Sequence, residues 1–286
     1  MRKSRVGYWL VLPYVVYFLV FVAYPLLFSL ILVFHRWDIV TPMQWIGFKN
    51  FVRIVNDPLF FISIRNTLYF LTIHVPLQII VALAFALLLH SKMKGRGFFR
   101  SIYFFPVVVS GVVVTILWQQ LYAYDYGVLN GMLTNVGLAR VPWLVSPDIA
   151  MVSIALMATW KNVGIYIVLF LVGLQNIPRE LYDAAAIDGA NAFQRFSRIT
   201  LPMLNSTVVV IVVLSTIGGF SLFIEPYVLT GGGPMQSTLS GMLYIYNQAF
   251  YFNHMGYAAA LGFLYALIIL GVVVAQRKLV ETETVA

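Results

Sequence analysis

The chain has 286 residues, of which 61% are hydrophobic and only 10% are charged. Polar groups could not cover so much apolar surface in a soluble domain, so the composition excludes a soluble globular protein and indicates an integral membrane protein. The net charge of +8 does not indicate nucleic acid, because the basic residues are scattered through short connections between apolar runs, where membrane topology and anionic lipid account for them. The chain has no cysteine, which excludes disulfides, thiol chemistry and cysteine-based metal sites.

Long charge-free runs predict helices that cross a membrane. A helical span needs about 20 apolar residues, and the alternating pattern of an outer-membrane barrel is absent. The first run follows Arg2, Lys3 and Arg5 and is too long for an ordinary signal-peptide core, so we expect it to be a retained span. We expect an all-α fold, a polytopic membrane protein with six transmembrane helices in a single domain over 1–286. The predicted spans lie near 8–34, 67–89, 101–122, 149–175, 205–229 and 257–276.

The basic residues also predict the orientation of these spans, because cytoplasmic connections carry the excess of Lys and Arg. One side has five such residues: Arg36, Lys49, Arg53, Arg65 and Arg140. The other side has twelve: Arg2, Lys3, Arg5, Lys92, Lys94, Arg96, Arg100, Arg179, Arg195, Arg198, Arg277 and Lys278. We therefore expect both termini and the connection between the fourth and fifth spans to be cytoplasmic.

Two segments are expected outside the spans. Residues 47–58 read as an external loop with one short helix that begins near Lys49. Residues 229–237 concentrate helix breakers, and the following stretch, 239–252, is too short and too interrupted for a secure span. We expect this stretch to be external or re-entrant.

The connection between the fourth and fifth spans carries the most specific pattern in the chain. Pro178 favours a helix start, and Glu180 and Asp183 suit the positive N-terminal end of that helix. Gly189 permits the turn that ends it. Alanines at 184–186 would let a partner surface approach closely. An amphipathic linker on the membrane surface is the alternative, but a linker needs neither the Asp-Gly-Ala step at 188–190 nor the Ile-x-Leu-Pro ending at 199–202.

This pattern resembles the "EAA" loop of bacterial ABC importer permeases, the coupling element that docks into a cytoplasmic ATPase subunit. The resemblance covers nearly the whole chain and is most specific in its second half. It is carried in order by Trp160 to Gly164, Gly173 to Pro178, Tyr227 to Pro234, Tyr244 to Gln248 and Gly256 to Ala260. The chain is most similar to carbohydrate permeases of the maltose and glycerol-phosphate type, specifically the partner with Thr-Gly-Gly-Gly-Pro. Two further spans and a large external domain of the maltose permease have no counterpart, so its maltose contacts do not transfer.

The resemblance implies a type I ABC importer permease fold in a bacterial cytoplasmic (inner) membrane. It also implies a heterodimer with a second permease chain, two ATP-binding cassette subunits and an extracytoplasmic solute-binding protein that delivers a sugar, an oligosaccharide or a glycerol phosphodiester. The chain has no Gly-x-x-x-x-Gly-Lys-Ser/Thr phosphate loop, so we expect no enzyme activity and no cofactor on it, with ATP and Mg bound by the partner ATPases. The predicted coupling residues are Glu180, Asp183, Ala184, Ala185, Asp188, Gly189, Ala190, Ile199 and Pro202. The last two could instead only set the start of the fifth helix.

Lys161 and Glu225 are charges inside apolar runs, where each costs about 2.5 to 3.5 kcal/mol at mid-membrane. Such residues usually line a cavity, and they could bind the ligand or pair with each other. The structural alternative is that Lys161 extends to the interface and Glu225 caps the end of its helix before Pro226. Family analogy and aromatic chemistry extend the predicted substrate pathway. Its members are Trp160, Lys161, Asn162, Gly164, Tyr166, Gly219, Phe220, Ser221, Glu225 and Tyr227.

Three other classes of membrane protein fit less well. A proton- or sodium-coupled carrier would need several ionisable residues at the midplane and repeated halves, but only Lys161 and Glu225 qualify and no repeat is visible. The glycines at 231–233 are a weak candidate for a channel filter. An embedded enzyme would need a nucleophile-base pair or a metal motif on the spans, and His74 and His90 are isolated in the sequence.

Overall fold

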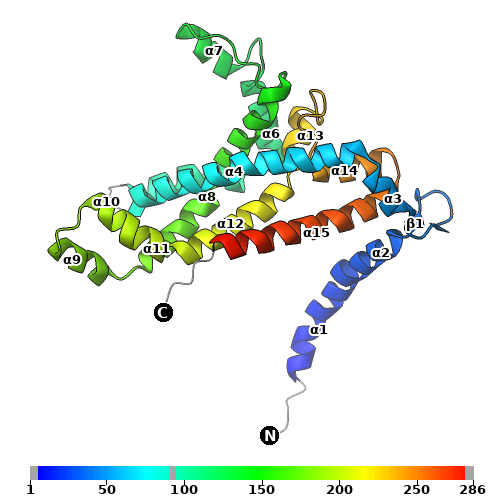
Figure 1. Cartoon of the computed structure of the whole chain (residues 1–286), viewed down its shortest axis with the longest axis horizontal. Coiled ribbons are helices and arrows are strands. Elements are labelled where there is room, and N and C mark those ends of the chain that lie inside the picture. The colour runs from blue at the N-terminus through cyan, green and yellow to red at the C-terminus, as the bar shows by residue number, and fades with distance from the viewer. Residues whose placement is uncertain (1–5, 91–94, 281–286) are drawn as a thin grey trace. The chain divides into compact units, whose positions relative to one another are not determined.

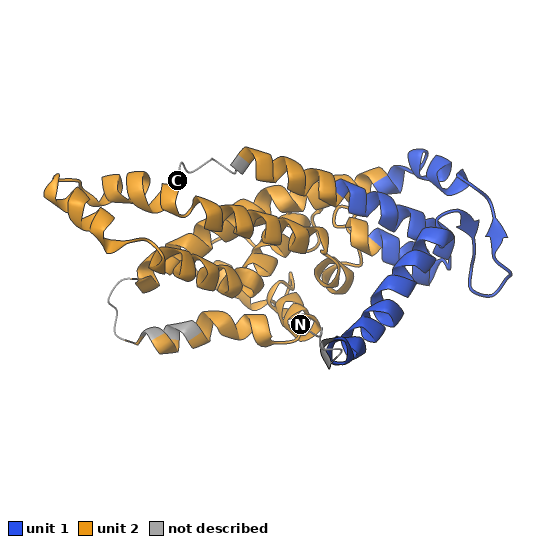
Figure 2. Ribbon diagram, turned by 90° about the horizontal axis from the view of Figure 1, so that it is seen from below, with its two compact units in different colours: residues 1–60, 244–268 blue, residues 61–243, 269–286 orange. Residues whose placement is uncertain are grey.

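The structure is a computed structural model that describes residues 6–90 and 95–280. Five of the residues that predicted the orientation, namely Arg2, Lys3, Arg5, Lys92 and Lys94, lie outside the described residues. The chain forms two compact units, drawn in different colours in Figure 2. The first unit comprises residues 1–60 and 244–268, and the second comprises residues 61–243 and 269–286.

Helices account for most of the described chain (Figure 1). The elements up to residue 121 are α1 (Val6–Phe18), η1 (Leu19–Ala23), α2 (Tyr24–Leu32), β1 (His35–Arg36), β2 (Gln44–Trp45), α3 (Lys49–Val55), α4 (Pro58–His90), α5 (Arg96–Val108) and α6 (Gly111–Leu121). The remaining elements are α7 (Val128–Asn135), α8 (Pro147–Gln175), α9 (Arg179–Ile187), α10 (Ala192–Arg195), η2 (Phe196–Thr200), α11 (Leu201–Met203), α12 (Asn205–Phe220), α13 (Ile224–Leu229), α14 (Gly241–Tyr246), η3 (Asn247–Tyr251) and α15 (Met255–Val280).

The first unit begins with a continuous helical run, in which α1 passes through the π-helical turn η1 into α2. Pro25 is the second residue of α2. A proline has no backbone N–H and its ring clashes with the preceding turn, so the helix widens there. The Tyr24 N–H accordingly donates to the Leu19 carbonyl, five residues back. The run therefore stays helical across its proline.

The first unit continues with a short antiparallel hairpin of β1 and β2, in which His35 pairs with Trp45. The buried side chain of Asn50, on α3, donates to the backbone oxygens of Val33 (2.8 Å) and His35 (3.0 Å). These bonds satisfy carbonyls left open where α2 ends and fix α3 against that end. The backbone of α15 also approaches the hairpin closely, because a Cβ at Gly256 would overlap the His35 carbonyl.

The second unit is built around α8, which packs against α5 and α12. Gly164 makes the approach of α5 possible, because a Cβ there would lie 2.5 Å from the Tyr103 carbonyl and 3.2 Å from the Phe104 Cα. Small residues allow such close helix packing in membranes. The core of this unit draws on α4, α8 and α12 and includes Ala82, Ala86, Ile167, Phe170, Leu174, Leu204 and Ile211.

Among the described residues, five helical segments are long and apolar enough to cross a membrane. They are Tyr8–Leu32, Pro58–His90, Pro147–Gln175, Asn205–Leu229 and Met255–Leu279. A bent pair, Ser101–Val108 with Gly111–Leu121, makes six if it counts as one span. The predicted third span is thus present but is not one straight helix. Its halves meet at 107° because Val109 and Ser110 have extended backbones.

The other irregular regions agree in part with the predictions. The short helix predicted to begin near Lys49 is confirmed as α3, and its external location stays a prediction. The run at 205–229 is broken between Phe220 and Ile224, so Glu225 lies in the first turn of α13 and does not cap the end of a helix, as one alternative proposed. Proline is tolerated in a first helical turn, which is where Pro226 lies.

Candidate functional site

A polar cavity of about 260 Å³ lies within the second unit. Its wall comes from α4, α8, α12, the break after α12 and α13, which are far apart in the sequence. The residues that line it are Phe70, His74, Ala158, Lys161, Asn162, Ile165, Tyr166, Ser215, Gly218, Gly219, Ser221, Leu222, Ile224 and Glu225. Six of them, Lys161, Asn162, Tyr166, Gly219, Ser221 and Glu225, were predicted for the substrate pathway.

Lys161 and Glu225 form an ion pair in this wall. The Lys161 Nζ lies 3.2 Å from the Glu225 Oε1 and donates to it, and the two side chains are only 13% and 10% exposed. The break before α13 allows this contact, because it brings Glu225 back toward α8. Gly111, at the start of α6, leaves room for the ammonium group, since a Cβ there would lie 2.8 Å from Nζ. Each charge is thereby neutralised inside the apolar part of the chain, where an unpaired charge is costly.

His74 is a cavity residue that the sequence reasoning treated as isolated. Its ring stacks on Phe70 with centroids 4.8 Å apart, and its Nδ1 lies 2.9 Å from the Thr159 Oγ1. The available signal was a single histidine inside the run at 67–89. His74 is thus a hydrogen-bonded residue of the cavity wall.

The other predicted pathway residues lie elsewhere in the second unit. Trp160 is half exposed and its ring lies 5.4 Å from that of Trp118. Gly164 is at the packing contact between α5 and α8, and Phe220 is fully buried. Tyr227 is half exposed on α13. Charged residues inside apolar runs therefore predicted the position of the cavity better than aromatic residues did.

The connection at 178–202 forms α9, a turn, α10, η2 and α11. Gly189 has a φ of +77° at the end of α9. The Ala190 N–H donates to the Ala185 carbonyl at 2.9 Å, and the Gly189 N–H donates to the Ala186 carbonyl at 3.2 Å. These two bonds define a Schellman turn, which favours glycine at this position. The predicted helix start after Pro178 and helix stop at Gly189 are both confirmed.

The second half of this connection starts with a capped turn. The side chain of Asn191 accepts from the Gln194 N–H, and the side chain of Gln194 accepts from the Asn191 N–H, each at 2.9 Å. This reciprocal arrangement is a capping box. The π-helical η2 then precedes Pro202, as η1 precedes Pro25 in the first unit.

Much of the connection is exposed, although two of its residues tie it to the core. Ile199 and Tyr182 pack against the core of the second unit, and the Tyr182 hydroxyl lies 2.8 Å from the Thr200 Oγ1. Glu180, Asp183, Ala184, Asp188, Gly189 and Pro202 are exposed, and Ala185 and Ala190 are half-buried. Ile187, on the last turn of α9, is 87% exposed. The connection thus exposes both polar and apolar side chains that the rest of this chain does not cover.

Apolar spans, a polar cavity between them and an exposed helical connection are features of the membrane subunit of a transporter. The family model described as "Binding-protein-dependent transport system inner membrane component" matches residues 78–282. The chain belongs to this family of permeases.

Relatives resemble the chain over nearly its full length. It is 35% identical to the trehalose/maltose transport system permease protein MalF of Thermococcus litoralis, over 97% of this chain and 94% of that protein. It is 36% identical to the arabinooligosaccharides transport system permease protein AraP of Bacillus subtilis, over 97% and 89%. It superimposes with a TM-score of 0.85 on a chain of a bacterial ABC transporter involved in alginate import, at 25% identity over 99% of this chain and 97% of that one. The chain therefore has the type I ABC importer permease fold.

Proposed function

We propose that the chain forms half of the translocation pore of an ATP-driven carbohydrate importer. Its partners would be a second permease chain, two ATP-binding cassette subunits that bind ATP and Mg, and an extracytoplasmic solute-binding protein. The observation that carries this proposal is the full-length similarity to permeases named for trehalose and maltose, arabinooligosaccharides and lactose. A solved transporter with the same fold is in complex with a periplasmic protein that carries an alginate pentasaccharide, which supports delivery by a binding protein.

The cargo is a neutral carbohydrate in this proposal. Lys161 is already neutralised by Glu225, so the cavity offers no unpaired lysine or arginine among its lining residues to an anionic ligand. Asn162, Tyr166 and Ser221 offer uncharged groups, which suit sugar hydroxyls. Phe70 and Tyr166 supply the aromatic part of the wall. The pair formed by Lys161 and Glu225 shapes the wall and accepts or donates hydrogen bonds at its edge.

Coupling to ATP hydrolysis runs through the connection at 178–202. Its exposed surface, rigid Schellman turn and capping box suit a docking element that must move as one body. With both termini and this connection in the cytoplasm, closure of the paired ATPases would move α9 and rock the two permease chains around the cavity. Hydrolysis on the separate ATPase subunits would reset the cycle.

The test is ATPase activity of the assembled transporter in nanodiscs. The chain would be co-expressed with a candidate second permease, ATPase and binding protein, and assayed with a panel of oligosaccharides and glycerol phosphodiesters. We expect stimulation by one carbohydrate only when its binding protein is present. Uptake that follows a proton or sodium gradient, with no co-purifying ATPase, would contradict the proposal. Stimulation by a phosphodiester alone would contradict the neutral cargo.

A further inference from the structure

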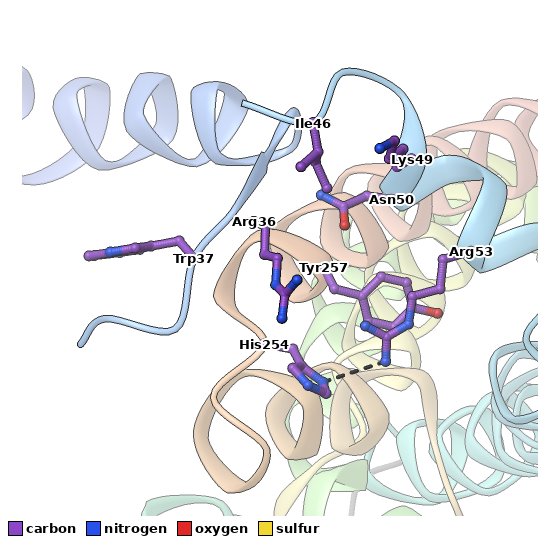
Figure 3. Close-up of a pocket in the computed structure, with 8 residues that line it drawn as sticks. All are labelled: Arg36, Trp37, Ile46, Lys49, Asn50, Arg53, His254 and Tyr257. Carbon is purple, nitrogen blue, oxygen red and sulfur yellow. Dashed lines mark hydrogen bonds between the residues drawn. The ribbon is translucent and has the colours of Figure 1, made fainter. Parts of the chain in front are cut away.

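A second, basic pocket lies within the first unit (Figure 3). It has a volume of about 360 Å³ and is lined by Arg36, Trp37, Ile46, Lys49, Asn50, Arg53, His254 and Tyr257. In Figure 3 the side chains of Arg36 and Arg53 extend toward His254, and Lys49 lies at another edge beside Ile46. The lining includes three permanent cations and no carboxylate. Such a lining favours an anionic ligand.

These cations lack a partner of opposite charge within the part of the chain that the structure describes. None of Arg36, Lys49 and Arg53 has a carboxylate oxygen within 4.0 Å of its side-chain nitrogens there. The nearby carboxylate, Asp57, is occupied by the hydroxyls of Tyr244 and Tyr257, which both donate to it. Burial opposes the charge on Asp57, but these hydrogen bonds prevail and hold its pKa below the usual value. Asp57 therefore stays ionised, but it is not among the residues that line the pocket and forms no ion pair with the three cations within the described residues.

The hydrogen bonds around His254 leave N–H groups of the Arg53 guanidinium without an acceptor there. Tyr244 donates to Asp57, so its oxygen accepts from the Gln248 Nε2 at 3.1 Å. The Gln248 Oε1 must then accept from the His254 Nδ1, 3.0 Å away. Because that nitrogen carries the proton, it cannot also accept from the Arg53 Nη2 at 3.5 Å.

The guanidinium of Arg53 is nevertheless held firmly. It lies over the ring of Tyr257, 3.8 Å from the centroid, in a cation–π contact. Burial, followed by the charges of Arg53 and Arg36, lowers the pKa of His254 and keeps this imidazole neutral at pH 7. A positioned guanidinium with unused N–H groups is the usual way proteins bind phosphate and carboxylate oxygens.

The pocket lies where three apolar spans begin or end. This position indicates whether the anion it binds is a lipid headgroup or a free ion. Trp37 follows the span Tyr8–Leu32 by five residues, Arg53 precedes the span Pro58–His90 by five, and His254 directly precedes the span Met255–Leu279. These positions correspond to a boundary between hydrocarbon and water, the depth of lipid headgroups.

The exposed face of α3 gives an independent indication of lipid. Val52 and Val55 are 62% and 70% exposed, and Phe48, just before the helix, is 70% exposed. Their spacing of four and three residues puts them on one face, while Lys49 and Arg53 of the same segment line the pocket. An apolar stripe beside basic residues is typical of a segment that lies in the membrane interface.

We propose that this pocket binds the phosphate of an anionic phospholipid headgroup, with Arg36 and Arg53 as its principal donors and Lys49 at its rim. The bound lipid would hold the hairpin, α3 and the start of α15 together at the membrane boundary. The group that binds is a phosphate oxyanion. The exposed apolar stripe of Phe48, Val52 and Val55 indicates that this phosphate belongs to a lipid and is not a free ion.

The test is native mass spectrometry of the full chain after delipidation, titrated with phosphatidylglycerol, phosphatidylcholine or inorganic phosphate. Arg36→Gln is the principal variant, because the Arg36 side chain forms no ion pair within the described residues whose loss would unfold the unit, and Lys49→Gln is the second. Arg140→Gln is the matched control, since Arg140 is an exposed cation elsewhere whose partner is Asp125. Each lost charge should weaken phosphatidylglycerol binding about fivefold, as expected from the gain of about 1 kcal/mol per basic residue at an anionic membrane.

The wild type and Arg140→Gln should retain phosphatidylglycerol in preference to phosphatidylcholine, and Arg36→Gln should lose that preference. Equal retention by wild type and Arg36→Gln would overturn the site. Binding of inorganic phosphate that displaces phosphatidylglycerol at equal concentration would overturn the lipid as its ligand. A double variant, Arg36→Gln with Lys49→Gln, that remains folded by circular dichroism but binds phosphatidylglycerol as the wild type does would overturn it as well.

Discussion

The connection at 178–202 and the cavity of the second unit are built in opposite ways. The connection is one contiguous stretch whose turns are closed by local hydrogen bonds, and most of its predicted coupling residues are exposed. The cavity is assembled from helices that are up to about 150 residues apart in the sequence, and its charged groups are buried and paired. A partner can dock on the exposed connection without any repacking of this chain. A change in the cavity wall, by contrast, must be absorbed by the core.

The largest expected effect is the loss of uptake on Gly189→Asp. The φ of +77° makes any L side chain strained there, by about 1 to 2 kcal/mol, and a carboxylate would stand on the surface proposed to meet the ATPase. A Cβ at Gly189 would meet nothing within 4 Å in its own chain, so the fold should survive. We expect transport by the reconstituted importer to fall to background while the amount of protein in the membrane stays unchanged.

Gly137→Asp is the matched control for this variant. Gly137 has a φ of +81°, and the turn that it forms at the end of α7 has the same two hydrogen bonds, from Leu138 to Leu133 and from Gly137 to Thr134. It is equally open to solvent. Uptake that persists in Gly189→Asp would contradict the docking role, and equal loss in both variants would assign the effect to the strain of the turn.

Smaller effects are expected from breaking the ion pair in the cavity. Lys161→Met would leave Glu225 buried without its partner, which costs about 3 kcal/mol, at the low end for buried pairs because the cavity admits water. The double variant Lys161→Met with Glu225→Leu should regain most of that stability, since neither charge is then left alone. The measurement is the thermal midpoint in detergent for the wild type, both single variants and the double variant.

Uptake by the double variant separates two roles of the pair. If the pair only shapes the wall, uptake returns together with stability. If either side chain binds the cargo, uptake stays low although the midpoint recovers. A single Lys161→Met variant as stable as the wild type would contradict the structural importance of the contact itself.

The sequence predicted the contiguous features well, because their causes are local. Pro178, Gly189 and the spacing of the connection are signals that act within a few residues, and the structure has the helix start and the turn at those positions. Hydropathy predicted the spans for a similar reason, since insertion into lipid depends on the mean hydropathy of consecutive residues. Lys161 and Glu225 were found because a charge is expensive anywhere inside such a window.

The directions of the helices and the contacts between distant segments were less predictable from the sequence. Hydropathy is blind to the bend at Val109 and Ser110, because the run remains apolar on both sides of it. The break after Phe220 turns Glu225 toward Lys161, and nothing local to either residue specifies the other. His74 joins the wall only through its partners Phe70 and Thr159, of which Thr159 is on another helix. Contacts between distant segments are decided by packing, which a single sequence does not display.

The smallest expected effect distinguishes two neighbouring glycines of the cavity wall. A Cβ at Gly219 would overlap the Leu71 side chain, whereas a Cβ at Gly218 would meet nothing within 4 Å. Gly219→Ala therefore forces the buried Leu71 to shift, at a cost of about 1 to 3 kcal/mol, offset by about 1 kcal/mol of better helix propensity. Gly218→Ala gains the propensity alone, so its thermal midpoint in detergent should equal or exceed that of the wild type, and Gly219→Ala should lie below it. Equal midpoints for the two alanine variants would show that the wall yields to one methyl group, and the contrast between a rigid cavity and a tolerant surface would then fail at this position.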